Sequence, residues 1–246
     1  RRQCELFHKP FTLEFSKKIV RAKIHNQIVV LDRYGRSRQM NVQEATQNMK
    51  ILERKVFTCT SIDQIMGYEG AAARYYFSTL GRLVESDFRF EKRSRRPPKD
   101  AFNSMLSLGY SMLMNEIYGK LENRGLNPYF GFMHQDREKH PTLASDLMEE
   151  WRAVIVDAVV MNLINGHEIK IEQFSYDTYG NGVFLSRDAM KIFINKMEKR
   201  MGTDNSYLKH IEYRVSFRRS LELQIDSLIY AMQEEDMDLY QPVRIR

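Results

Sequence analysis

Apolar residues recur every three or four positions along most of this chain, which is the spacing of one face of an α-helix. The segments predicted to be helical on this basis are 41–57, 61–67, 69–85, 100–123, a stretch from Pro141 through 163, a helix from Ser186, and 207–233. Ser61 with Gln64 three residues later has the form of a capping box, and so has Asn41 with Glu44. β-Branched side chains dilute the pattern at 16–31, where a helix is still favoured.

The pattern changes beyond Gly166. The stretch 167–186 alternates polar and apolar residues and holds Asn181 and Gly182, a pair typical of a two-residue hairpin turn. No internal repeat and no low-complexity linker interrupts the sequence. We therefore predict a mainly α fold, with one multi-helix domain over residues 1–246 and a small β-hairpin.

Composition narrows the class of protein. The 246 residues are 43% hydrophobic, which is enough to bury a core, and no apolar run approaches the ~20 residues that a bilayer crossing needs. Cys4 and Cys59 are too few for a disulfide framework, so we expect an intracellular, cytoplasmic protein without a membrane span. A net charge of +6 favours a polyanionic partner such as nucleic acid without deciding the matter.

Candidate chemistry gathers in front of one strongly apolar predicted helix. His134 follows a glycine-containing loop, and Asp146 and Glu149 lie three residues apart at the start of the helix. At about 100° per residue, Glu149 falls on an apolar stripe, whereas Asp146 falls on a narrow polar stripe with Glu150 and Asp157. A carboxylate on an apolar stripe needs an arginine, a proton or a metal ion as its partner.

Each of these residues also has an ordinary structural interpretation. Asp146 can satisfy amides at a helix N-terminus, Glu149 can form an ion pair with Arg152, and His134 can be a surface or hydrogen-bonded core histidine. Glu69, which lies between two glycines, can be a first-turn acid that stabilises its helix dipole. The spacing lacks an HExxH or CxxC pattern, so the residues alone leave a metal site and these structural roles both open.

Four motifs resemble those of one known family. "GYEGAAARYYF" (67–77), "RRPPKDAFNSMLSLGYSMLMNEIYG" (95–119), "GLNPYFGFMH" (125–134) and "LASDLMEEWR" (143–152) occur in the order found in the CRISPR-associated integrase of the spacer-acquisition complex, the first of the numbered CRISPR-associated proteins. The similarity extends over the whole chain. It implies the helical catalytic domain of a metal-dependent DNA endonuclease and integrase.

The same resemblance implies roles for individual residues. Glu69, His134 and Glu149 match the family's catalytic triad, which together holds one Mg²⁺ or Mn²⁺ ion. Asp146 matches a further acid, either beside the ion or as an alternative ligand. The positions that match substrate-facing residues are Asn103, Tyr110 and Arg137.

The reaction implied by the resemblance is a transesterification. The 3′-hydroxyl of an incoming prespacer attacks a phosphodiester at the border of a CRISPR repeat. The implied partners are double-stranded DNA (prespacer and repeat) and the small second subunit of the adaptation complex. Family members carry an N-terminal β-rich domain that helps to form a homodimer. That domain is expected to be missing here, with residues 1–15 as the remnant of its linker.

Basic residues are expected to hold the DNA backbone. They are Lys92, Arg93, Arg95, Arg96, Lys99, Arg214 and Arg218. The alternative for 92–99 is a solvated loop, since Pro97 and Pro98 oppose a helix there. A further basic strip is formed by Lys17, Lys18, Arg21 and Lys23. The alternative functions are a non-catalytic helical DNA-binding or scaffold protein and a standalone nuclease for branched DNA.

Overall fold

The computed structural model describes residues 1–7, 9–134, 138–177 and 182–246, which form a mainly helical body. The α-helices are α1 (Arg2–Leu6), α2 (Pro10–Ser37), α3 (Gln43–Phe57), α4 (Ile62–Leu80), α5 (Ala101–Asn123), α6 (Thr142–Met148), α7 (Ala158–Asn165), α8 (Arg187–Met201) and α9 (Phe217–Glu234). Short 3-10 turns are η1 (Ser86–Phe88), η3 (Ile171–Gln173) and η4 (Met237–Leu239), and η2 (Ala153–Asp157) is a π-helical segment. The strands are β1 (Phe174–Tyr176), β2 (Val183–Leu185), β3 (Asp204–Asn205) and β4 (Val215–Ser216). The predicted mainly α class is confirmed.

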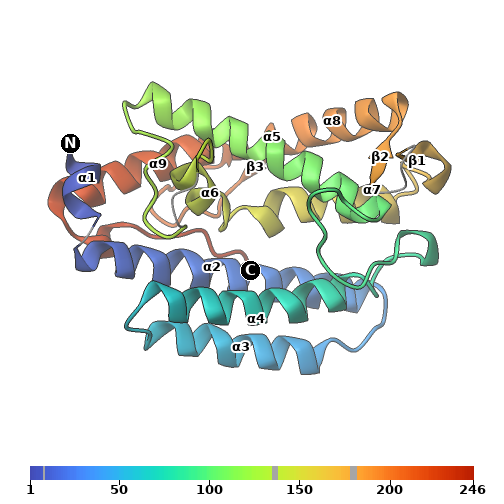
Figure 1. Ribbon diagram of the computed structural model, residues 1–246, viewed down its shortest axis with the longest axis horizontal. Helices are drawn as coiled ribbons and strands as arrows, with labels where there is room; N and C mark the ends of the chain where they lie inside the picture. Colours follow the sequence, from blue (N-terminus) through green and yellow to red (C-terminus); the bar gives the residue numbers. More distant parts are fainter. Residues whose placement is uncertain (8, 135–137, 178–181) are drawn as a thin grey trace.

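The helices lie in two layers with a further segment between them (Figure 1). α2, α3 and α4 pack against one another on one side, and α5, α8 and α9 lie on the other. The segment from α6 through η2 to α7 runs between the layers and contacts both α2 and α5. Residues 153–164 of this segment are almost all apolar, and a helix of that kind is stable when protein surrounds it.

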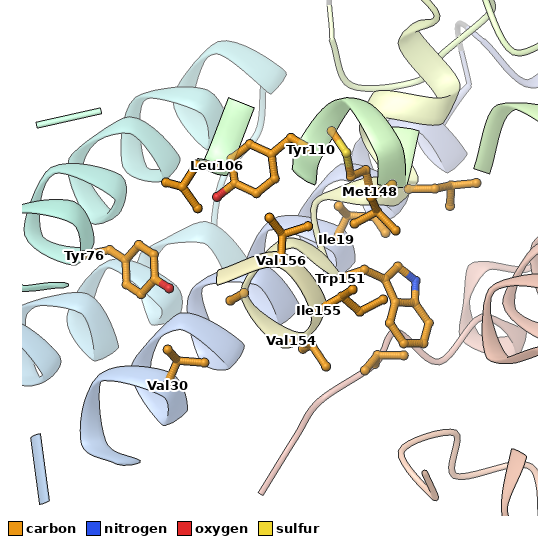
Figure 2. Packing of buried hydrophobic residues seen from close by; sticks show 14 of the residues in the cluster. Ile19, Val30, Tyr76, Leu106, Tyr110, Met148, Trp151, Val154, Ile155 and Val156 are labelled. Carbon is orange, nitrogen blue, oxygen red and sulfur yellow. The ribbon is translucent and has the colours of Figure 1, made fainter. Parts of the chain in front are cut away.

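The middle segment fills the core of the molecule (Figure 2). Trp151, Ile155 and Val156 are fully buried and share one core with Ile19 of α2 and Leu106 of α5. Burial of a large apolar side chain contributes about 1.5–3 kcal/mol. Part of the site described below is attached to this segment, whose backbone is held by a fully buried core.

Local start signals explain where several helices begin. Ser61 Oγ accepts from the Gln64 amide at 3.3 Å, and the Gln64 side chain accepts from the Thr60 amide at 2.9 Å. The predicted helix starts near residue 100 and at Ser186 are confirmed, and Asp100 and Ser186 cap α5 and α8. The predicted box at Asn41 is not formed, because α3 begins at Gln43 and the Asn41 side chain accepts from that first amide. The favoured helix at 16–31 lies within α2.

The prediction of two helices around Gly67 is wrong. α4 continues from Ile62 to Leu80 through both Gly67 and Gly70. A glycine inside a helix costs about 1 kcal/mol relative to alanine. The buried residues Ile65 and Ala72 lie on either side of the two glycines, and their packing against the α2 and α3 layer outweighs that cost.

The last predicted helix is also too long. Residues 207–216 are not helical, and α9 begins only at Phe217. Ser216 is its N-cap, with Oγ accepting from the Arg219 amide at 3.2 Å. Val215 pairs with Asn205 in the β3–β4 ladder, which uses backbone groups that a helix would need.

The predicted hairpin is confirmed. β1 and β2 are antiparallel, with Tyr176 opposite Val183. Of the predicted turn pair, Asn181 lies outside the described residues and Gly182 lies within them. The Val183 amide donates to the Pro98 carbonyl at 2.9 Å, so the hairpin is joined to the basic loop 92–99.

Residues 1–15, expected to be the remnant of a linker, form α1 and the first turns of α2. Phe11 and Phe15 are buried there, and both rings make edge contacts with Phe132. This segment is therefore packed against the loop that precedes α6. Among the described residues, no helix combines the length and the apolar character that a membrane crossing requires.

Gly109 on α5 permits the close approach of the middle segment, and its replacement tests that packing. A Cβ there would lie 2.4 Å from Val156 Cγ1 and 3.1 Å from the Phe193 ring. We expect Gly109→Ala to lower the free energy of unfolding by about 1–3 kcal/mol through overpacking, as measured by urea denaturation. Gly119 on the same helix has open space around it, so Gly119→Ala is expected to stabilise by about 0.5–1 kcal/mol. Equal stability of the two variants would contradict this account.

Candidate metal and phosphate site

Five side chains, carried by α2, α4, the loop before α6 and the stretch at the end of α6, converge at one mostly buried point. Lys23 of α2 contacts Glu69 of α4 and lies with its Nζ 2.5 Å from Glu149 Oε2 at the end of α6. His134, in the loop before α6, has its Nε2 at 3.7 Å from Glu149 Oε1. The Arg152 guanidinium reaches the same oxygen at 3.0 Å. The three residues of the predicted triad are therefore brought together, with a lysine ammonium between the two glutamates.

Asp146 orients both the histidine and its loop. Its carboxylate accepts from the amides of Phe132, Met133 and His134 at 2.7–3.0 Å. The same carboxylate lies 2.6 Å from His134 Nδ1. Because a carboxylate accepts, Nδ1 is the donor and Nε2 is the ring nitrogen left to face Glu149. A Cβ at position 131 would lie 2.8 Å from Asp146 Oδ2, so Gly131 lets the loop close over the acid.

Oppositely charged groups of the site each favour the charged form of their neighbours. Burial disfavours the charged form of Glu149, but Arg152, Lys23 and His134 outweigh it and hold its pKa at about 2. Burial likewise opposes protonation of His134, yet the hydrogen bond to Asp146 and the charge of Glu149 raise its pKa above the ordinary value. For Lys23, Glu149 and Glu69 overcome the cost of burial and raise the pKa. The cluster is thus a compact set of opposed charges.

A second buried acid lies behind the cluster. Asp157 accepts hydrogen bonds at 2.6 Å from both Tyr76 and Tyr110, and burial raises its pKa to about 6. The guanidinium groups of Arg152 and Arg93 lie over the Tyr110 ring, at 4.8 Å and 5.4 Å from its centre. Tyr110, predicted to face substrate, thus has its hydroxyl buried on Asp157 and its ring against the two arginines, and its role toward substrate stays a prediction.

Asn103, also predicted to face substrate, is bound to the basic loop 92–99, and its role toward substrate stays a prediction. Asn103 is fully buried, its amide donates to the Lys92 carbonyl at 3.0 Å, and its Oδ1 accepts from the Ser94 amide at 3.1 Å. Arg93 turns inward to the same Asn103 oxygen at 2.9 Å and to Ser107 Oγ at 3.1 Å. Asn103 therefore holds the basic loop in place, and Arg93 belongs to its support.

The other predicted DNA-backbone residues differ in exposure and pairing. Lys92, Arg95, Arg96 and Lys99 are exposed. Arg218 forms ion pairs with Glu116 at 3.0 Å and with Glu198 at 2.9 Å. Arg214 lies before the first residue of α9. Arg137 lies outside the described residues.

The predicted polar stripe of Asp146, Glu150 and Asp157 is buried in full. Glu150 accepts from the Tyr240 hydroxyl at 2.5 Å and from the Val243 amide at 2.6 Å. Burial raises its pKa to about 7. Its role is to hold the C-terminal segment, and it does not reach the cluster around Glu149.

Lys23 is the residue whose importance the sequence patterns missed. The patterns group it with its basic neighbours on a surface strip, but its side chain is only 7% exposed. The available signal is its position four residues after Ile19, which places it on the apolar face of α2. A lysine on such a face requires buried anionic partners.

Of the ordinary structural roles considered for these residues, the structure confirms one and contradicts two. The ion pair of Glu149 with Arg152 is confirmed. Glu69 is not a first-turn acid, because α4 begins at Ile62. Asp146 does not cap its own helix, because α6 begins at Thr142 and its carboxylate serves the preceding loop.

The donor set suits a hard divalent ion. Glu69 and Glu149 offer carboxylate oxygens, and His134 offers an Nε2 whose ring is oriented by a carboxylate, as is usual for metal-binding histidines. As arranged, with Lys23 between the acids, the described part of the chain has no set of three His, Cys, Asp or Glu side chains close enough to hold a metal. The ammonium nevertheless marks a position where a cation is stable.

Comparison with known proteins points to one family. The family model described as "CRISPR associated protein Cas1" matches residues 1–199. A CRISPR-associated endonuclease Cas1 of Mycobacterium tuberculosis H37Rv is 41% identical over 219 residues, which cover 89% of this chain and 64% of the relative. A protein of the same description from Leptospira interrogans is 37% identical over 202 residues, which cover 77% of each. The chain thus spans less than two thirds of the mycobacterial relative.

Solved structures share the fold. A "Cas6-RT-Cas1--Cas2 complex" contains a chain that matches all of this one with a TM-score of 0.89 and 29% identity, over 26% of its own length. A "Casposase bound to integration product" matches all of this chain and 68% of its own with a TM-score of 0.87. At 24% identity, the second likeness concerns the fold alone.

The contact between Asp146 and His134 generates a pH prediction. In metal-free protein, Asp146→Asn is expected to lower the pKa of His134, because burial would still oppose protonation while the anionic partner is gone. The wild-type contact adds stability that is full below the ordinary histidine pKa and is lost as pH rises through the raised folded value. NMR titration of the imidazole protons measures the pKa of His134 in the wild type and in the variant. His25 is the internal control, and an unchanged His134 titration would contradict the assignment.

Proposed function

The chain belongs to the family of CRISPR associated protein Cas1, and on that premise we propose that it is a divalent-metal-dependent DNA integrase and endonuclease that inserts spacers into a CRISPR array. The observation that carries the proposal is the convergence of Glu69, Glu149 and His134 on one buried cation position. These residues come from three separate elements, and placing the partly buried Glu69 carboxylate beside the buried Glu149 carboxylate is costly unless a cation lies between them.

We assign the ion-binding groups from this convergence. Glu69 and Glu149 would supply oxygen ligands to Mg²⁺ or Mn²⁺, and His134 Nε2 would supply the nitrogen, which favours Mn²⁺ somewhat. Asp146 would act on the ring orientation of His134 through Nδ1. When bound, such an ion supplies Lewis acidity at a phosphate oxygen.

The rest of the site fits a transesterification between DNA strands. The attacking group is the 3′-hydroxyl of the incoming DNA, so the protein needs to position phosphates and does not need a nucleophile of its own. Arg152 is suited to that task. Its side chain is 15% exposed, it lies over the Tyr110 ring, and its Nε has no hydrogen-bond partner among the described residues.

We propose the partners on chemical grounds and on the family. Double-stranded DNA, as prespacer and as repeat, would be held through its backbone by the exposed Lys92, Arg95, Arg96 and Lys99. One of the solved structures that share this fold is a complex of Cas1 with Cas2, and we propose Cas2 as the small second subunit here. Formation of a homodimer by the full-length protein is part of the same proposal.

A second candidate function has a specific observation in its favour. Lys23 and Arg152 already neutralise Glu149, which is what a purely structural charge cluster would look like. In that case the chain would be a non-catalytic DNA-binding or scaffold protein. The two candidates differ in whether divalent metal and the acids are required for strand transfer.

The decisive variants are Glu69→Gln, His134→Ala and Glu149→Gln. Each is expected to reduce Mn²⁺-dependent strand transfer into a supercoiled repeat plasmid, with Cas2 present, by at least on the order of a hundredfold, since each removes a group acting at the reacting phosphate. DNA affinity should stay within a few-fold. Glu222→Gln is the matched control, because Glu222 is also paired with a buried lysine, Lys120, at 2.8 Å.

Full activity in any one of the three variants, or strand transfer that needs no divalent ion, would contradict the metal-binding triad. The products are read on a gel that separates nicked, relaxed and supercoiled plasmid. Loss of activity in the Glu222→Gln control would mean that the assay reports folding and not the site.

Backbone contacts are tested by salt dependence. Arg95 and Arg96 make no ion pair within the described residues, whereas Arg218 is held by two glutamates. Replacing Arg95 and Arg96 by Gln is expected to weaken duplex binding and to reduce the slope of log K against log salt by about 0.9 for each phosphate that is no longer neutralised. Arg218→Gln should leave the slope unchanged. Equal slopes for both variants and the wild type would contradict a role for this loop.

A further inference from the structure

Lys23 occupies an unusual position for a lysine. Its side chain is 7% exposed, and its ammonium, carried by α2, contacts Glu69 of α4 and Glu149 at the end of α6 at once. The chain has a second buried lysine with two acidic partners, Lys120, which lies 3.2 Å from Glu116 and 2.8 Å from Glu222. Lys120 takes no part in the proposed metal site, because its partners Glu116 and Glu222 are not members of the proposed triad.

The place taken by the Lys23 ammonium is also the place that a divalent ion would need. An ion bound by Glu69 and Glu149 must lie within bonding distance of oxygens that now contact Nζ, and the Glu149 oxygen is only 2.5 Å from it. Two cations cannot share that space. Either the ion stays out or the ammonium moves, and the flexible four-carbon stem allows the lysine head to move while α2 stays fixed.

The net charge of the cluster changes sign when a divalent ion binds. Three carboxylates (Glu69, Asp146, Glu149) face two cationic side chains (Lys23, Arg152), so with a neutral His134 the cluster has one net negative charge. Addition of a divalent ion turns this into one net positive charge while Lys23 remains tethered nearby. A site that is anionic before loading and cationic afterwards repels a phosphodiester first and attracts it second.

We propose that Lys23 is a tethered placeholder cation that neutralises Glu69 and Glu149 until a divalent ion displaces it, after which its ammonium is free to face the DNA phosphate. This inference rests on the proposed function, since it requires that an ion binds at the triad. It goes further by making Lys23 a positioning residue that sets metal affinity and the order in which metal and DNA enter. The exchange forms and breaks only ionic contacts, so no proton or electron is transferred.

The test compares Lys23→Met with Lys120→Met in the whole chain. Calorimetric titration of the metal-stripped proteins with Mn²⁺ alone is expected to give a Kd for Lys23→Met that is lower than the wild-type value by at least about tenfold. Although Arg152 still pairs with Glu149, loss of the ammonium removes the positive charge shared by Glu69 and Glu149, so this pair gains more from the ion, and no ammonium has to be displaced. Lys120→Met should keep the wild-type Kd, although both variants lose thermal stability without metal. An unchanged or weaker Kd for Lys23→Met would overturn the proposal.

A second measurement uses the wild-type protein and does not depend on the folding of a variant. Lysines are labelled with an amine-reactive reagent with and without Mg²⁺, and the sites are quantified by mass spectrometry. Labelling of Lys23 is expected to rise several-fold with Mg²⁺, because the displaced ammonium becomes accessible, while Lys120 stays constant. Labelling of Lys23 that stays low at saturating Mg²⁺ would overturn the exchange.

Failure of the metal site and failure of the placeholder role give different results. If wild-type protein binds no Mn²⁺ in the calorimeter, the metal-dependent function falls and the placeholder role falls with it. If wild-type protein binds Mn²⁺ but Lys23→Met binds it no more tightly, the function stands and only the role of Lys23 is refuted.

Discussion

A carboxylate that is taken out of water needs a partner, and the middle segment of this fold buries Asp146, Glu149, Glu150 and Asp157. Three of them have partners that are part of the fold itself. Asp146 binds three loop amides, Glu150 binds a tyrosine and an amide of the C-terminal segment, and Asp157 binds two tyrosines from α4 and α5. Each of these acids therefore joins distant parts of the chain to one helical segment.

Glu149 differs from the other three in the nature of its partners. It is surrounded by the charged heads of two long side chains, Lys23 and Arg152, and by the imidazole of His134. Ionic contacts of this kind can be exchanged for a metal ion without moving any backbone, whereas Asp146 and Glu150 accept from backbone amides that such an exchange would have to displace. Asp146, Glu150 and Asp157 hold the loop and helices in position, and Glu149 is the acid that we propose as a metal ligand.

The parts of this arrangement that depend on local signals could be predicted from the sequence. Helix starts at Ser61, Asp100 and Ser186 follow from capping side chains, and the hairpin follows from alternation. The helix that runs through Gly67 could not be predicted, because packing against other helices outweighs the local preference of glycine. For residues 207–216, a short strand pair competes with an apolar pattern that also suits a helix.

The site was predictable in a different way. The grouping of Glu69, His134 and Glu149 came from the family resemblance, since their spacing alone left ordinary roles open. The direction in which the side chains point could not be predicted from the sequence. Asn103 and Tyr110 were expected to face substrate, but their polar groups are bound to the basic loop and to Asp157. In the sequence, Lys23 resembles its basic neighbours, and only its position on the apolar face of α2 indicates that its side chain is buried.

The central claim is that Glu69, His134 and Glu149 form one cation position that Lys23 and a divalent ion occupy in turn. Anomalous diffraction from crystals grown with Mn²⁺ tests it most directly. The account predicts a manganese peak about 2.1 Å from oxygens of both glutamates, bonded to His134 Nε2, with the Lys23 side chain turned away. A map with Lys23 still between the glutamates and the manganese elsewhere would contradict it.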